Sequence, residues 1–373
     1  MHEPPPSPSP AADAGAHAVA WPDPSRRDAF DAWLAPLVAA HGLVPSSLRP
    51  ASADASFRRY LRIDGADGAS RIVMDAPPDK EDCRPFAHVQ RLMAEAGLNV
   101  PQVLAWDEAH GFMLLSDLGR ETVIERLDPA RPADAHAWYL QATDVLLQWQ
   151  QASKPDTLPP YDAALLRREL ALFPDWYLAR HRGVALDDGQ QATLARAFDA
   201  IVAANLAAPS VYVHRDFMMR NLMVPAETGA PLGVLDFQDA VWGPATYDIA
   251  SLLRDAFISW DEDFVIDITV RYWEKARRAG ILGSGSASGW GDDFGEFYRA
   301  VEWMGLQRHL KVAGIFARLT LRDGKPRYLA DTPRFIGYIR STAGRYRELV
   351  PLLRLVDAIE GTEAVAGYAF GRV

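Results

Sequence analysis

The spacing of apolar residues along the chain changes character near residue 117. Before it, short runs of β-branched and apolar residues predict strands, and the Gly- and Asp-rich turn DGADGAS between the first two predicts a hairpin. An amphipathic helix beginning after Ser25 precedes these runs, and a second helix at 84–96 interrupts them. The predicted strands are 57–63, 71–74, 103–106 and 112–116.

After residue 117 the apolar residues recur every three or four positions, the period of a helix with one buried face. Two short apolar runs, 211–213 and 222–224, break this pattern and predict strands on either side of a polar loop. The sequence therefore predicts an α+β protein with a β-rich first part and a mainly helical second part. The predicted helices are 138–149, 165–178, 192–206, 249–257, 264–276, 294–316 and 335–356.

The polar loop between those two strands reads HRDFMMRN, residues 214–221. In phosphoryl transfer, H-R-D-x-x-x-x-N supplies an Asp that accepts the proton of the attacking hydroxyl and an Asn that holds a metal ion. Asp216 and Asn221 occupy those positions. Asp236 ends the next apolar run, at the position of a second metal ligand, and Gln238 stands where protein kinases have Gly.

These residue types suit that chemistry. The oxygens of a nucleotide phosphate are negative, so the attacking hydroxyl needs an aimed base and hard cations that neutralise the developing charge. Magnesium prefers oxygen ligands, which an Asn amide and an Asp carboxylate provide. A single Asp or Asn between strands most often makes a turn, but the ordered set predicts a phosphotransferase centre. His214 is predicted to support the loop from beneath.

The chain resembles the superfamily of aminoglycoside phosphotransferases and choline kinases. That superfamily carries H-x-D-x-x-x-x-N, then a metal-binding Asp, then G-x-x-x-x-D-[IL]-A, and this chain has all three, the last as GPATYDIA at 243–250. FRRYLRI at 57–63, MDAPP at 74–78 and QRHLKVAGIF at 307–316 add a narrower resemblance. They resemble the cell-wall sugar kinases, which phosphorylate the anomeric hydroxyl of N-acetylmuramate and N-acetylglucosamine in peptidoglycan recycling.

The resemblance implies a two-lobe protein kinase-like fold, with a nucleotide-binding N-lobe at 25–117 and a catalytic and substrate-binding C-lobe at 118–373. It also implies ATP and Mg²⁺ as cofactors and a small amino sugar as substrate. The hinge between the lobes is expected at Ser116, Asp117 and Leu118, whose backbone groups are candidates for binding adenine; an ordinary turn is the alternative. Asp248, in the third motif, is expected to brace the catalytic loop.

The expected N-lobe departs from the kinase pattern. Met74 and Asp75 stand where a strand lysine would pair with the α and β phosphates. Arg58 and Arg59 are candidates for nucleotide binding, but alternation along a strand sends them to opposite faces, so at most one turns toward ATP, and a solvated strand edge is an equal alternative. The turn ASADAS at 51–56 replaces the Gly-rich loop. A second hypothesis is therefore a pseudokinase that acts as a binding module without transferring phosphate. The intact catalytic loop argues against it.

Candidates for substrate binding come from the C-lobe. Asp239, three residues after Asp236, is a candidate for a sugar hydroxyl or the metal, with a turn role as the alternative. Arg308 and Lys311 lie three positions apart on one predicted helix and are candidates for binding a lactyl carboxylate, with a solvent-facing basic strip as the alternative. A kinase of another small alcohol, such as an aminoglycoside, choline or homoserine, is an alternative function.

Composition excludes several other classes. A formal net charge of −10 argues against nucleic acid or an anionic membrane as partner, and no apolar run approaches the roughly 18 residues of a membrane span. Residues 1–24 lack the basic and apolar regions of a signal peptide and are expected to form a disordered tail. The single cysteine, Cys83, excludes an internal disulfide and favours the cytoplasm. No obligate protein partner is inferred.

Overall fold

The computed structural model describes residues 19–362 except 22, 54–56, 228 and 284–289. The predicted tail therefore lies outside the described residues as far as residue 18, and so does half of the turn ASADAS. Chain contacts separate two compact units: the first ends at Leu118 but omits Arg91–Val100, which belongs to the second with the residues from Gly119 onward. The predicted α+β class, with a strand-rich first part and a mainly helical second part, is confirmed.

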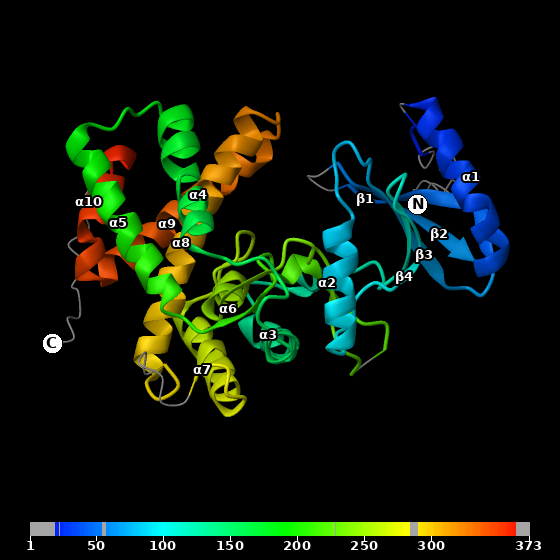
Figure 1. The fold of residues 1–373 in the computed structure, drawn as a ribbon. Coiled ribbons are helices and arrows are strands. Elements are labelled where there is room, and N and C mark those ends of the chain that lie inside the picture. The colour runs from blue at the N-terminus through cyan, green and yellow to red at the C-terminus, as the bar shows by residue number, and fades with distance from the viewer. Residues whose placement is uncertain (1–18, 22, 54–56, 228, 284–289, 363–373) are drawn as a thin grey trace, which may run out of the picture. The chain divides into compact units, whose positions relative to one another are not determined.

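The first unit is built on a five-stranded antiparallel sheet with the order β1-β2-β3-β5-β4 (Figure 1). The predicted hairpin is confirmed as β2 and β3, which pair from Arg59 with Asp75 to Asp64 with Ser70. β1 was not predicted: it contains Pro45 and Pro50, and such residues are tolerated only because it is an edge strand with register shifts. The strands are β1 (Leu43–Ala53), β2 (Arg59–Gly65), β3 (Ser70–Asp75), β4 (Val103–Asp107) and β5 (Phe112–Ser116).

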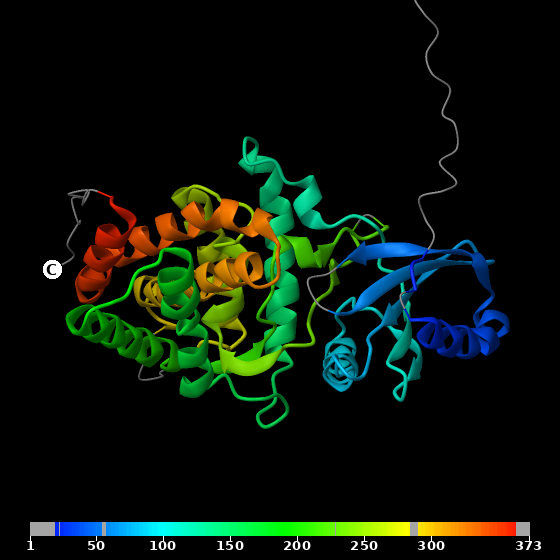
Figure 2. The same cartoon turned by 90° about the horizontal axis from the view of Figure 1, so that it is seen from above.

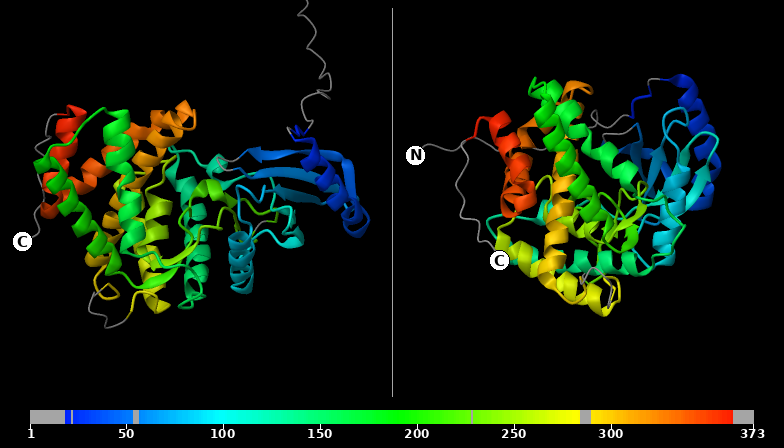
Figure 3. Two further views of the ribbon diagram at one scale, coloured as in Figure 1. Left: turned by 45° about the horizontal axis from the view of Figure 1, so that its top comes forward. Right: turned by 60° about the vertical axis from the view of Figure 1, so that its left-hand side comes forward.

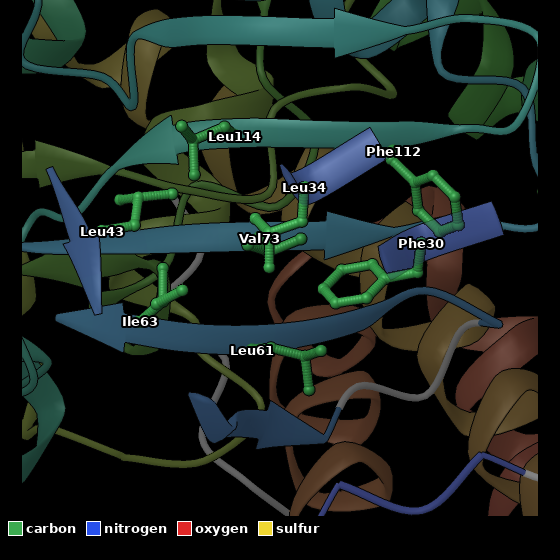
Figure 4. Close-up of a cluster of buried hydrophobic side chains, with 8 residues drawn as sticks. All are labelled: Phe30, Leu34, Leu43, Leu61, Ile63, Val73, Phe112 and Leu114. Atoms are coloured by element: carbon green, nitrogen blue, oxygen red, sulfur yellow. The ribbon is translucent and has the colours of Figure 1, made fainter. Parts of the chain in front are cut away.

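Helix α1 (Pro24–His41) covers one face of this sheet, as seen from above in Figure 2. Phe30 and Leu34 of α1 form a buried cluster with strand residues such as Val73 (Figure 4). The helix was predicted to begin after Ser25, but it begins at Pro24, and its cap is Asp23, whose carboxylate accepts the Ser25 amide at 2.9 Å. Trp21 packs against Phe30 at 4.8 Å between ring centroids, so ordered contacts begin within the segment expected to be a tail. Helix α2 (Arg84–Glu95) matches its prediction.

The second unit is mainly helical around two small antiparallel sheets (Figure 3). One pairs β6 (Ser210–Val213) with β9 (Val241–Pro244), and the other pairs β7 (Leu222–Met223) with β8 (Gly233–Val234). The long helix α8 contacts α6, α9 and a π-helical segment, and most of its residues are buried. The α-helices are α3 (Pro132–Gln151), α4 (Ala163–Leu170), α5 (Asp188–Leu206), α6 (Thr246–Leu253), α7 (Glu262–Arg278), α8 (Phe294–Leu321), α9 (Thr332–Arg345) and α10 (Val350–Glu360).

Shorter helical segments account for two differences from the predicted helices. The helix predicted at 165–178 is α4 followed by the π-helix Phe173–His181. The helix predicted at 335–356 is α9 and α10, separated at Tyr346, which is extended with φ −118° and ψ 125°. The apolar spacing continues across that break, so the periodicity predicted one continuous helix. The 3₁₀ turns are Val123–Arg126, Met219–Asn221, Pro326–Asp331 and Arg347–Leu349. None of the described helices is long and apolar enough to cross a membrane.

Gly314 permits the close packing of α8 against the start of the π-helix. A Cβ atom built on Gly314 would lie 2.3 Å from the carbonyl oxygen of Leu172 and 2.4 Å from its carbonyl carbon. Backbone atoms cannot rotate away from such a contact, so any side chain at this position must push two elements apart.

We expect Gly314→Ala to lower the free energy of unfolding by about 1–3 kcal/mol or more, the usual cost of overpacking. Gly337→Ala in α9 is the matched control, because nothing lies within 4 Å of its added Cβ. Replacing Gly by Ala inside a helix should there be neutral or stabilising by up to about 1 kcal/mol. Urea denaturation of both variants measures the difference; equal stability would contradict the packing argument.

Candidate active site

The loop between β6 and β7 is held from beneath by two buried side chains, His214 and Asp248. The ring of His214 accepts the amide of Asp216 at Nδ1 (3.3 Å) and, through Nε2, donates to the carbonyl oxygen of Leu235 (3.0 Å). Burial lowers the pKa of His214, so the ring is neutral and has one donor and one acceptor nitrogen, as these bonds require. His214 thus ties the loop to the segment that carries Asp236.

Asp248 lies on α6 and reaches the start of the same loop. Its carboxylate accepts the amides of His214 at 2.7 Å and Arg215 at 3.0 Å. Burial raises the pKa of Asp248 to about 6, against the opposing effects of His214 and the two amide bonds. Arg215 has a positive φ of 76°, which is uncommon for a residue with a long side chain. These contacts are the ones that a brace for the catalytic loop requires.

Asp216, Asn221 and Asp236 are brought together at the other side of the loop. The side-chain nitrogen of Asn221 donates to the carbonyl oxygen of Asp216 at 2.8 Å and to the Asp236 carboxylate at 3.3 Å. Both partners are acceptors, so the amide nitrogen faces them and the amide oxygen Oδ1 is left for another ligand. Within the described chain, no hydrogen bond holds the Asp216 carboxylate, which is fixed through its backbone instead.

Asp236 also adopts a left-handed conformation, with φ 64°. Its second carboxylate oxygen accepts the side-chain nitrogen of Gln238 at 2.9 Å, which gives a role to the residue that departs from the kinase pattern. The Asn221 oxygen and the Asp236 carboxylate form a hard, oxygen-only donor set suited to Mg²⁺. No three His, Cys, Asp or Glu side chains cluster as a metal cage in the described residues. A two-residue set fits Mg²⁺, which takes its other ligands from water and phosphates.

Arg308 and Lys311 are buried on α8, with 5% and 9% of their surfaces exposed, so the alternative of a solvent-facing basic strip is wrong. The ammonium group of Lys311 pairs with Glu169 of α4 at 3.0 Å and donates to the hydroxyl of Tyr247 at 3.1 Å. The guanidinium of Arg308 lies 5.1 Å from the ring centroid of Tyr247. Lys311 is thereby engaged in an internal ion pair, and binding of a substrate carboxylate by Arg308 and Lys311 stays a prediction.

Glu169 is the residue at this site that sequence reasoning missed. It binds Arg215 of the catalytic loop at 2.6 Å, in addition to Lys311. Burial alone would raise the pKa of Glu169, but the two cations outweigh it and hold that pKa below its ordinary value. No motif contains Glu169, and 46 residues separate it from Arg215, so only the fold brings them together. Asp239 is exposed, and its backbone oxygen accepts Arg215 at 3.4 Å.

In the first unit, Arg58 and Arg59 have separate partners. Arg58 pairs with Glu81 at 3.2 Å. Arg59 donates through Nε to the buried Asp75 at 2.8 Å, and Arg26 of α1 donates to the other carboxylate oxygen at 2.9 Å. In the strand segment where a phosphate-binding lysine was expected, the buried carboxylate of Asp75 therefore connects α1 to the sheet. Arg59 is part of this ion-pair group.

The expected hinge residues lie at the end of β5. The amide of Ser116 donates to the carbonyl oxygen of Gln102 at 2.9 Å, and its hydroxyl accepts the Gln102 amide at 2.8 Å. The carboxylate of Asp117 binds Arg62 at 2.6 Å and accepts the Ser70 hydroxyl at 2.5 Å. These groups stabilise the sheet, and adenine binding by the segment that ends at Leu118 stays a prediction.

Comparison with known proteins agrees with this geometry. Residues 47–281, more than half of the chain, match the phosphotransferase enzyme family. A protein of Pseudomonas aeruginosa named N-acetylmuramate/N-acetylglucosamine kinase is 50% identical over 339 residues, covering 90% of this chain and 96% of that protein. A protein of the same name from Neisseria meningitidis is 48% identical, over 86% of this chain and 93% of its own length.

Solved structures share the fold at low identity. A choline/ethanolamine kinase family protein of Mesorhizobium loti aligns with a TM-score of 0.55 at 15% identity, covering 89% of this chain and 99% of its own. An ADP-bound aminoglycoside phosphotransferase aligns with a TM-score of 0.54 at 13% identity, covering 85% of this chain and 97% of its own. The family match, the close relatives and the loop geometry agree: the chain belongs to the phosphotransferase enzyme family and is a phosphotransferase.

Proposed function

We propose that the protein transfers the γ-phosphoryl group of ATP to the anomeric hydroxyl of N-acetylmuramate and N-acetylglucosamine, producing the sugar 1-phosphates. The observation that carries this proposal is the 50% identity, over 90% of the chain, to a relative named for these two sugars. The anomeric position and a place in peptidoglycan recycling rest on the sequence resemblance. The proposed location is the cytoplasm, which the single cysteine of the chain favours.

Asp216 is the proposed general base. The sugar hydroxyl oxygen attacks the γ-phosphorus, the bond from that phosphorus to the bridging oxygen breaks, and ADP leaves with the electron pair. Asp216 orients the hydroxyl and takes its proton; a base of this kind typically contributes ~10²–10⁴-fold. The absence of a competing hydrogen bond to the Asp216 carboxylate, among the described residues, supports this role. His214 and Asp248 hold the loop in place for it.

Asn221 and Asp236 are the proposed ligands of Mg²⁺. The ion would neutralise the charge on the β and γ phosphates of ATP. Asn221 also connects the two acids, because its amide nitrogen binds the backbone of Asp216 and the carboxylate of Asp236. This linkage fixes the distance between the base and the metal ligands without any contribution from the substrate.

A panel of acceptors tests the assignment. We expect Mg²⁺-dependent ADP release with N-acetylmuramate and N-acetylglucosamine, and a phosphorus NMR signal coupled to the anomeric proton. Kanamycin, choline and homoserine, tested in parallel, should give rates at the background of ATP hydrolysis. Turnover of one of these alone would discard the sugar and keep the phosphotransferase. Magnesium-independent nucleotide binding without turnover of any acceptor would favour a binding module.

A further inference from the structure

A buried group of four side chains lies behind the catalytic loop, and its centre is Glu169. The Glu169 carboxylate receives Arg215 at 2.6 Å, Lys311 at 3.0 Å and the hydroxyl of Tyr161. Only 6% of its side chain is exposed, compared with 19% for Arg215 and 11% for Lys311. One carboxylate therefore serves two cations in a place that water reaches poorly, where each ion pair depends strongly on its partner.

Arg215 connects this group to the proposed base. Its φ of 76° lies in the left-handed region, which is strained for a residue with a long side chain and persists only where the surroundings hold it. Three contacts hold Arg215 here, one of them a long bond of 3.4 Å from its guanidinium to the carbonyl oxygen of Asp239. Asp248 holds the Arg215 amide at 3.0 Å, and Glu169 holds the guanidinium at 2.6 Å. Arg215 is thus fixed at both its backbone and the end of its side chain.

The dihedral angles of Arg215 determine where the next residue, Asp216, points. Asp248 holds the amide of Arg215, and the side-chain anchor, the ion pair with Glu169, opposes relaxation to a negative φ from the other end of the residue. If that anchor is lost, Asp216 keeps its backbone bonds to His214 and Asn221, but the residue before it is held less firmly, so Asp216 can shift. A displacement of about 1 Å at a reacting group is enough to lower a rate by about 10²-fold.

We propose that Glu169 is a positioning residue for Asp216 that acts through Arg215. The inference rests on the proposed role of Asp216 as base. It assigns to α4, outside every motif of the chain, a residue on which the turnover rate depends. Lys311 has the different role of balancing charge, since it shares the carboxylate without touching the loop backbone.

Glu169→Gln tests the proposal. The amide keeps the size of the side chain but loses the charge that holds Arg215, so we expect kcat to fall by about 10–100-fold. KM for ATP and for the sugar should stay within about threefold, because neither substrate is expected to touch Glu169. An unchanged kcat with a lower thermal midpoint would overturn the proposal and leave Glu169 a structural residue only.

A double variant, Glu169→Gln with Lys311→Met, separates positioning from charge balance. The single variant leaves two buried cations without a carboxylate, whereas the double variant restores the net charge of the group, +1, found in the unchanged protein. We expect the thermal midpoint to recover toward that of the unchanged protein while kcat stays low, because Arg215 still lacks its anchor. A kcat that recovers together with the midpoint would overturn the proposal. This variant carries the test if the single variant does not fold.

Asp357→Asn is the matched control. Asp357 of α10 pairs with Arg340 of α9 at 2.5 Å, and their side chains are 8% and 25% exposed, close to the values for Glu169 and Arg215. Its loss should lower the thermal midpoint but leave kcat within about twofold.

Asp216→Asn distinguishes a failure of the proposed base from a failure of the positioning role of Glu169. If that variant keeps turnover, the proposed base fails; if it is inactive while Glu169→Gln is fully active, only the positioning role fails.

Discussion

Replacing Asp216 by Asn is expected to lower kcat by roughly 10²–10⁴-fold, the contribution of a general base. Asn matches Asp in size but cannot accept the hydroxyl proton. The structural contacts of Asp216 are made by its backbone, which binds His214 and Asn221, so the substitution leaves them in place. We therefore expect the variant to fold normally and to bind ATP with an affinity within about threefold of that of the unchanged protein.

Steady-state kinetics and calorimetric titration with a non-hydrolysable ATP analogue measure the two quantities separately. Asp199→Asn is the control, because Asp199 is an exposed acid of α5 whose one ion pair among the described residues is with Arg167 on the surface, at 2.7 Å. Such a pair is worth at most about 1 kcal/mol and its loss should not alter kcat. Turnover of Asp216→Asn within tenfold of the unchanged protein would remove Asp216 from the role of base.

The catalytic loop was predictable because its signals are local. Strand, polar loop and strand follow one another within 211–224, and the residues that meet there, Asp216, Asn221 and Asp236, are close in sequence. Gly- and Asp-rich turn chemistry likewise located the β2–β3 hairpin. Where a short stretch contains both the pattern and its partners, the sequence is sufficient.

Contacts between distant segments were not predictable in this way. Arg308 and Lys311 were candidates for substrate binding, and the alternative of a solvent-facing strip assumed that charged residues on a helix face water. α8 is instead enclosed by other elements, and Lys311 finds its counter-charge on α4, 142 positions earlier in the chain, in Glu169. Strand β1 was not predicted for a related reason. Its two prolines argue against a strand unless the strand lies at the edge of a sheet, and the position in the sheet depends on distant segments.

Removing the charge of Asp236 is expected to weaken the Mg²⁺ dependence of nucleotide binding as well as turnover. Asn is the appropriate replacement, because Asp236 has a φ of 64° and Asn tolerates the left-handed region, whereas Ala would add backbone strain. Changes in the outer shell of a metal site already cost about 10–100-fold in affinity, so loss of a charged ligand should cost at least that. We expect Asp216→Asn, by contrast, to retain Mg²⁺-dependent binding.

Calorimetric titration of ADP over a series of Mg²⁺ concentrations measures the effect directly. Asp156→Asn is the control, since Asp156 is also left-handed, with φ 59°, but is exposed in the connection between α3 and α4. It should match the unchanged protein in both binding and turnover. If Asp236→Asn lost turnover but bound ADP with unchanged Mg²⁺ dependence, Asp236 would act on the reacting phosphate or through Asn221 and not as a metal ligand. Partial recovery of turnover at high Mg²⁺ is the result that a weakened metal site requires.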